Sequence, residues 1–146
     1  MTQSGDLRRR LAAHTLLQRL RQTDGICILK TEDARRILRT EMLQSIGFYD
    51  PQKHPDARIP VQASAAETAA WIVKCAALHA GMTAALWQND LFVHIRITQP
   101  QTAAEALWET TAGSLTLLHP ERGLLDDFGS DSRDEAHLLF DRYCLK

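Results

Sequence analysis

The residues with the clearest capacity for chemistry are carboxylates gathered near the carboxyl end of the chain. They follow a short apolar hairpin pattern, and Arg133 lies among them. A dense group of carboxylates can bind a divalent cation, transfer protons or attract a cationic partner. The acids that we single out are Asp126, Asp127, Asp131, Asp134 and Glu135. The glycine and terminal glutamate of an EF-hand loop are missing, so a calcium-binding loop is not predicted. We predict instead that the five acids form one exposed patch that contacts a basic protein partner.

Histidines form the second candidate group, six in all. None shows the spacing of a zinc site or of a His-x-x-x-His pair, so no metal is predicted. His94 and Arg96 stand out because they lie two residues apart on a predicted strand, where both side chains project to the same side. Together they could contact an anion or a small ligand. The simpler interpretation is two polar residues on a solvated or helix-covered sheet face.

Catalytic motifs are otherwise missing from the sequence. There is no Gly-x-Ser-x-Gly, no P-loop and no dinucleotide-binding fingerprint. Binding is therefore favoured over catalysis, and no cofactor is predicted. A small enzyme or ligand-binding domain built around His94 and Arg96 remains an alternative.

Arginines in the first forty residues support a different alternative, nucleic-acid binding, because arginine forms bidentate bonds to phosphate. They are Arg8, Arg9, Arg10, Arg19, Arg21, Arg35, Arg36 and Arg39. The isoelectric point near 6.6 is far from the basic value typical of a nucleic-acid-binding domain, and no helix-turn-helix or RNP pattern is present.

Charge is nevertheless divided unevenly along the chain. Residues 1–60 carry 11 Lys or Arg against 7 Asp or Glu, whereas residues 61–146 carry 6 against 11. The first part should attract anions weakly and the second part cations.

Length and composition are those of a folded domain. The chain has 146 residues, of which 45% are hydrophobic and 24% charged, close to the average for soluble globular proteins. We expect one domain over residues 1–146. Three widely spaced cysteines, Cys27, Cys75 and Cys144, suggest buried thiols in a reducing compartment. Without a signal-peptide pattern or an apolar run of about 18 residues, we predict a cytoplasmic protein that does not bind membranes.

Hydrophobic periodicity predicts an α+β fold with a mostly antiparallel sheet and about five helices packed mainly on one side of it. We expect helices over 6–22, 31–46, 64–80 and 102–111, and a last helix that begins after Ser132. Capping-box patterns mark the starts at Ser64, Thr102 and Ser132. A short strand is expected at 26–29, with hairpins over 82–98 and 114–128. The proline-rich segment 48–60 is expected to be a surface loop.

The run from Gly113 to His137 resembles the end of some small bacterial immunity proteins of polymorphic toxin systems. The shared layout is a strand, a turn, a second strand, a segment rich in Asp and Ser, and a helix followed by acids. This resemblance covers about a quarter of the chain. It implies a cytoplasmic protein that binds and neutralises a cognate toxin, often a nuclease, whose cationic site an acidic surface would occupy.

Overall fold

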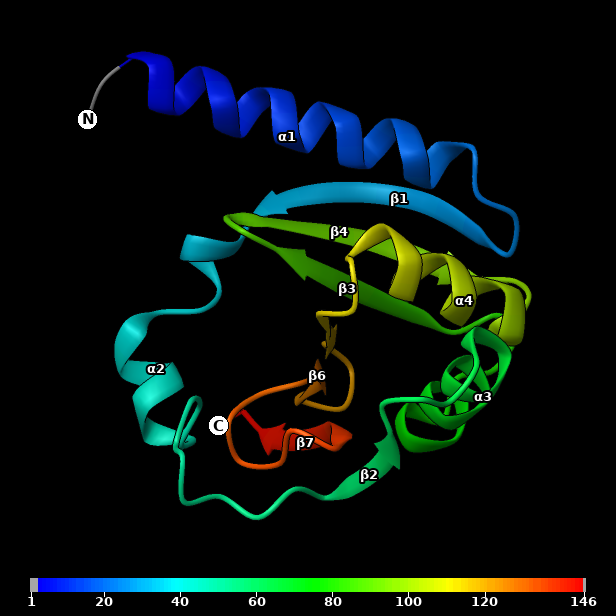
Figure 1. The fold of residues 1–146 in the computed structure, drawn as a ribbon. Helices are drawn as coiled ribbons and strands as arrows, with labels where there is room; N and C mark the ends of the chain where they lie inside the picture. Colours follow the sequence, from blue (N-terminus) through cyan, green and yellow to red (C-terminus); the bar gives the residue numbers. More distant parts are fainter. Residues whose placement is uncertain (1–2, 146) are drawn as a thin grey trace.

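Seven strands form one antiparallel sheet, in the order β1-β4-β3-β5-β6-β7-β2 (Figure 1). The structure is a computed structural model that describes residues 3–145. The strands are β1 (Ile26–Asp33), β2 (Ala57–Pro60), β3 (Thr83–Gln88), β4 (Leu91–Ile97), β5 (Leu115–His119), β6 (Leu124–Gly129) and β7 (His137–Cys144). The helices are α1 (Gln3–Arg21), α2 (Thr40–Ser45), α3 (Ala65–Ala76) and α4 (Pro100–Thr110), with a 3-10 turn, η1 (Ala34–Arg36). The predicted α+β class is confirmed.

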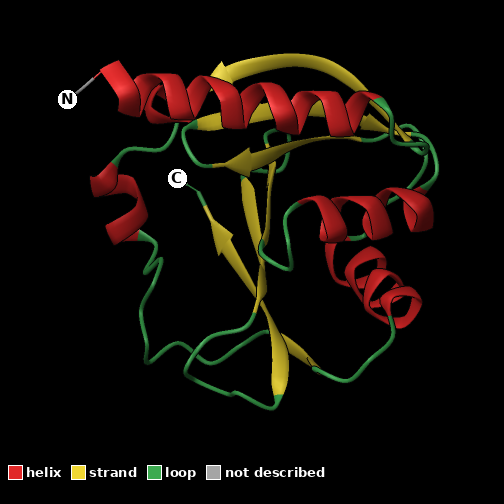
Figure 2. Cartoon of the chain, turned by 45° about the horizontal axis from the view of Figure 1, so that its top comes forward, coloured by secondary structure: helices red, strands yellow, loops and turns green. Residues whose placement is uncertain are grey.

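Apolar residues on the two faces of the sheet pack against different helices. On β4, Val93, Ile95 and Ile97 are fully buried in a core shared with α1, α3 and α4. Phe92, one residue out of phase, belongs to a smaller cluster with η1, α2 and Phe48. Figure 2 shows α1 running along β1 and β4. The period of two along β4 was predicted correctly, whereas the helices cover both faces and not mainly one.

The sheet is partly split in its middle. β3 pairs with β4 at six positions, but it pairs with β5 at only two, Ala85 with Leu118 and Leu86 with Leu117. Beyond these pairs the end of β3 and the start of β5 separate. A hollow therefore forms between two central strands, on the face that α2 only partly covers.

Local sequence signals fix the start of α3. Ser64 accepts a hydrogen bond from the backbone N–H of Glu67, and the Glu67 carboxylate accepts one from the backbone N–H of Ser64, which confirms the predicted capping box. The helix ends earlier than predicted, because Ala77 adopts the left-handed conformation with φ of 52°. The Thr102 capping box does not form, since α4 begins at Pro100 after Gln99.

The predicted last helix is wrong, because residues 137–144 form strand β7. The apolar residues there fit a helix and also a strand buried on both faces, so periodicity alone does not decide. Phe140 pairs with Phe128 of β6 on one side and with Ala57 of β2 on the other. Pairing with strands distant in the sequence outweighs the local pattern. No capping box forms at Ser132 either, and Asp131 and Asp134 accept hydrogen bonds from nearby backbone N–H groups within a turn.

The prediction for residues 31–46 is also wrong in part. Residues 30–33 continue β1 alongside β4, and the Asp33 carboxylate accepts a hydrogen bond from the backbone N–H of Arg35 to open η1. Only the six residues of α2 are α-helical. The expected loop 48–60 likewise ends in β2, the short edge strand beside β7.

Candidate functional site

Neighbouring aspartates of β6 point to opposite faces of the sheet. Asp126 is 0% exposed and lies on the face covered by α3. Its carboxylate accepts hydrogen bonds from Arg142 at 2.7 and 2.8 Å and lies 2.9 Å from Nε2 of His119. Burial alone would raise the pKa of Asp126, but the bonds from Arg142 and His119 hold it below its ordinary value. Asp126 is therefore an interior ion-pair residue, and the predicted single exposed patch of five acids is wrong.

Two more of the predicted acids are paired with cations of the same chain. Asp131 accepts two side-chain hydrogen bonds from Arg133, at 3.0 and 2.8 Å. Asp134 accepts one from Arg58 at 2.7 Å and contacts His137. Glu135 is exposed. These acids are spread over the turn between β6 and β7, where most of their charge is balanced.

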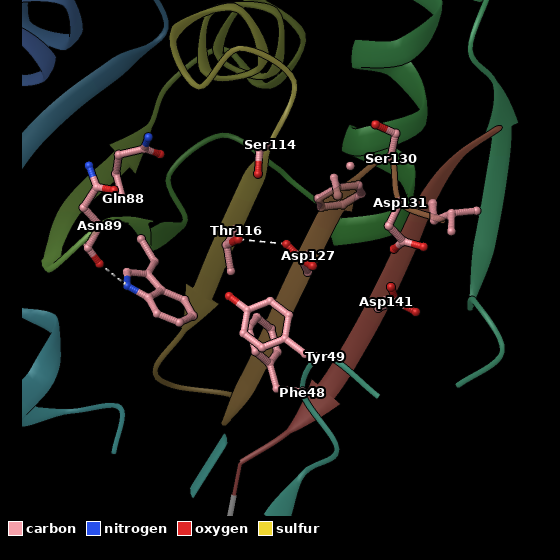
Figure 3. Close-up of a pocket in the computed structure, with 14 residues that line it drawn as sticks. Phe48, Tyr49, Gln88, Asn89, Ser114, Thr116, Asp127, Ser130, Asp131 and Asp141 are labelled. Carbon is pink, nitrogen blue, oxygen red and sulfur yellow. Dashed lines mark hydrogen bonds between the residues drawn. The ribbon is translucent and has the colours of Figure 1, made fainter. Parts of the chain in front are cut away.

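Asp127 is different, because it lies in a cavity of about 440 Å³ on the open face of the sheet (Figure 3). The cavity occupies the hollow between the end of β3 and the start of β5. Strands β3, β5, β6 and β7 and the loop after α2 supply its walls. The lining residues are Phe48, Tyr49, Trp87, Gln88, Asn89, Ser114, Thr116, Asp127, Phe128, Gly129, Ser130, Asp131, Leu139 and Asp141.

The Asp127 carboxylate has a hydroxyl partner but no cation. Thr116, its cross-strand neighbour on β5, donates a hydrogen bond of 2.8 Å from Oγ1. Within residues 3–145, no Lys, Arg or His nitrogen lies within ion-pair distance of Asp127. Burial raises the pKa of Asp127 against the lowering effect of the Thr116 hydrogen bond, and the charge of Asp141 raises it further. A carboxylate in this environment would be stabilised by an incoming cation.

Asp141, directly opposite Asp127 on β7, already has such cations. Its side chain is 3% exposed and lies 3.2 Å from Nζ of Lys53. Arg133 donates a second bond, of 3.1 Å, from Nη1. The two facing carboxylates thus differ in that one is neutralised within the chain and the other is open to the cavity.

Aromatic side chains form one wall of the cavity. Phe48 is buried, with its ring centroid 5.7 Å from that of Trp87. The Trp87 indole N–H donates to the backbone oxygen of Asn89 at 2.7 Å, which fixes the ring. Tyr49 is 80% exposed, and its ring projects toward the part of the cavity that holds Thr116 and Asp127 (Figure 3). Aromatic faces beside a carboxylate suit a cationic group.

The other predicted site, His94 with Arg96, lies outside this cavity. Nε2 of His94 lies 2.8 Å from the Glu32 carboxylate on β1, and Arg96 is exposed. The two side chains are not brought to Asp127, and neither is among the residues that line its cavity.

The arginines of α1 are exposed along its first half, at Arg8, Arg9 and Arg10. Arg9 lies 3.7 Å from Asp90 of the β3–β4 turn. Arg9, Arg10 and Arg35 line a second cavity, of about 420 Å³, against that turn. The basic cavity therefore adjoins the Asp127 cavity, because Gln88 and Asn89 line both, although these three arginines do not line the Asp127 cavity.

Sequence reasoning singled out Asp127 but missed the residues that make its surroundings. Phe48 and Tyr49 come from the segment expected to be a surface loop, and Trp87 and Thr116 from two different hairpins. The available signal was the alternation of a strand, which separates Asp126 from Asp127. Across the described part of the chain, no three His, Cys, Asp or Glu residues are placed to hold a metal ion, and no helix is long and apolar enough to span a membrane.

A scan against protein-family models, a search of curated proteins and a search of solved structures each found no match to this chain.

Proposed function

We propose that this protein binds a protein partner by accepting one of the partner's basic side chains into the Asp127 cavity. The observation that carries the proposal is the Asp127 carboxylate, which borders an open cavity and has only the Thr116 hydroxyl as its hydrogen-bond partner in residues 3–145. A buried or half-buried carboxylate ordinarily has a cationic partner. Here the partner's lysine or arginine supplies it.

The surroundings favour a cation over other ligands. Hydrogen bonds to a charged group contribute about 1.5–3 kcal/mol, and an exposed aromatic face adds about 0.5–1 kcal/mol for a cation. Asp131 and Asp141 also border the cavity, so an anionic ligand would meet three carboxylates. A basic residue would meet one carboxylate that lacks a cation and the rings of Trp87 and Tyr49.

The resemblance of the carboxyl-terminal run implies that this binding neutralises a toxin, although the helix of the shared layout is replaced here by strand β7. A toxin that cleaves nucleic acid must present cations to phosphate, and an acidic cavity can hold one of them. The proposed contact residue is Asp127, with Asp131 at the rim, and not the full set of five acids. Asp134 and Glu135 would contribute through their long-range field alone.

The proposal is tested with single capped amino acids as probes. N-acetyl-arginine methylamide and N-acetyl-lysine methylamide are titrated into the labelled protein while backbone and indole NMR shifts are followed. We expect saturable shifts at Thr116, Asp127 and the Trp87 indole, with a dissociation constant on the order of 1–10 mM. The citrulline analogue, which has the shape of arginine without its charge, should produce no saturable shift.

Two variants complete the test. Asp127→Asn removes the charge in the cavity and should abolish the response to both cationic probes. Glu135→Gln makes the same change of charge at an exposed acid of the nearby turn and should leave the response intact. Equal responses to arginine and citrulline, or equal responses in the two variants, would show that Asp127 does not recognise a cation.

A further inference from the structure

The two free edges of the sheet are protected to different degrees. Strand β2 has four residues and ends in Pro60, and a short edge that contains proline resists pairing with another chain. Strand β1 has eight residues and no proline. Among residues 3–145 it pairs only with β4, so within this described part of the chain its other side is an unpaired edge. Such an edge is a template for another strand.

A groove runs along this edge. A cavity of about 550 Å³ is bordered by Leu17, Leu20 and Arg21 of α1 and by the consecutive residues 26–31. Successive residues of a strand point to opposite faces, so a cavity lined by all of them lies against the strand's edge. Leu29, where the ladder with β4 is irregular, is 45% exposed in this region.

After the irregularity at Leu29, strand β1 is regular. Its opposite charges, on Lys30 and Glu32, lie on either side of Thr31. Lys30 and Glu32 are in register with His94 and Phe92 of β4, so both project to the same face. Their side chains are 63% and 36% exposed. Thr31 lies between them. An antiparallel copy of the strand centred on Thr31 places each Lys30 opposite the Glu32 of the other copy.

We propose that two copies of this chain form a two-fold dimer in which their β1 strands pair antiparallel with Thr31 on the axis. In a two-fold interface, if one residue of the first copy faces a second residue of the other copy, that second residue in the first copy faces the first residue of the other. The order lysine, threonine, glutamate meets that requirement, because opposite charges on directly facing strand residues attract. The pairing joins two seven-stranded sheets and leaves the Asp127 cavity of each copy free.

The first test is an exchange of charges. Lys30→Glu places two acids opposite two acids, and Glu32→Lys places two bases opposite two bases. Sedimentation equilibrium should show that each variant alone dimerises at least about tenfold more weakly than the wild type. An equimolar mixture of the two should form a heterodimer with nearly wild-type affinity, because both facing pairs are then of opposite charge.

This mixture separates dimer contacts from effects within one chain. Lys30 and Glu32 also contact each other within the chain, at 3.1 Å, and that contact stays broken in both members of the mixture. Recovery on mixing can therefore come only from contacts between copies. Circular dichroism of each variant verifies that it is folded. Absence of recovery, or unchanged dimerisation of either variant, overturns the proposal.

The second test fixes the register by disulfide formation. Facing residues of antiparallel strands have Cα atoms about 4.5–5.5 Å apart, within disulfide range. Cys27 and Cys144 are exposed, in contrast to the predicted buried thiols, so both are replaced by serine in the Thr31→Cys variant. This variant should give a covalent dimer under mild oxidation. In the Cys144→Ser variant, Cys27 is the built-in control, because the proposed register separates the two Cys27 residues by about 26 Å along the strands.

Two results would overturn the dimer in this form. Cross-linking through Cys27 in place of position 31 would show a different register. A wild-type chain that stays monomeric at about 1 mM would show that copies of the chain do not cover the edge, and would leave it to a peptide strand of another protein.

Discussion

Two adjacent aspartates of strand β6 lie on opposite faces of the sheet and differ in their burial and their partners. On the helix-covered face, Asp126 is fully buried and bonded to Arg142 and His119. On the open face, Asp127 has a hydroxyl partner, lines a cavity and lacks a cation within residues 3–145. The same residue type, one position apart, thus stabilises the fold in one case and is available for binding in the other. The side of the strand, and not the composition of the segment, sets the role.

The largest expected effect comes from breaking the buried network. Asp126→Asn should lower the free energy of unfolding by about 2–3 kcal/mol, because it removes the charge that Arg142 and His119 bond at a fully buried position, while the Arg142 side chain is 31% exposed and is partly solvated. Asp127→Asn should change it by about 1 kcal/mol or less, since the amide oxygen can still accept from Thr116. Urea denaturation of both variants at neutral pH measures the contrast. Equal losses would show that the two faces do not differ as we describe.

The pH dependence of stability sharpens the contrast, because the two pKa shifts have opposite signs. The pKa of Asp126 is lowered, so its contribution to stability is present above the unfolded-state pKa near 3.9 and is lost as the pH falls through the folded value. The pKa of Asp127 is raised, so its contribution is present below about pH 3.9 and is lost as the pH rises through the folded value.

The two signs are measured by comparing the stability of the wild type with that of each variant as the pH changes. Above about pH 3.9 the wild type should lose stability relative to Asp127→Asn as the pH rises through the folded pKa of Asp127. Below about pH 4 it should lose its advantage over Asp126→Asn as the pH falls. Denaturation midpoints measured across both ranges provide the check, and parallel curves for the three proteins would contradict both assignments.

A smaller effect is expected at the aromatic wall. Tyr49→Ala should weaken binding of the capped arginine probe about two- to fivefold, corresponding to an exposed cation–π contact of about 0.5–1 kcal/mol. Stability should fall by about 0.5–1.5 kcal/mol, because the residue is 80% exposed but its ring makes an edge-on contact with that of Phe48. NMR titration and thermal unfolding measure the two quantities separately. A loss of stability with unchanged binding would assign Tyr49 to packing alone.

The smallest effect is expected on the basic surface. Replacement of Arg8, Arg9 and Arg10 by alanine should leave stability within about 0.5 kcal/mol of the wild type, because these side chains are exposed. It should also leave the Asp127 cavity's response to capped arginine unchanged. Fluorescence anisotropy with duplex DNA and with single-stranded RNA tests the alternative function. Tight binding that falls steeply with salt and disappears in this variant would favour nucleic-acid binding.

The parts of the fold that the sequence predicted are those set by neighbours along the chain. The Ser64 and Glu67 capping box and the two hairpins depend on residues a few positions apart, and all are present. The last predicted helix fails because its apolar spacing suits two structures, and pairing of β7 with β6 and β2 selects the strand. The helix predicted over residues 31–46 is wrong in part for a similar reason, because pairing with β4 extends strand β1 through Asp33.

Local patterns in the sequence are enough to predict that acids are concentrated near the carboxyl end and that the chain forms an α+β fold. Which acid is open to a partner follows from the packed structure, because it depends on contacts between distant residues. Lys53 neutralises Asp141 from 88 positions away, and the split between β3 and β5 opens the hollow beside Asp127. The charge of a side chain is local information, whereas its burial and its partners are fixed only when strands and loops from the whole chain pack together.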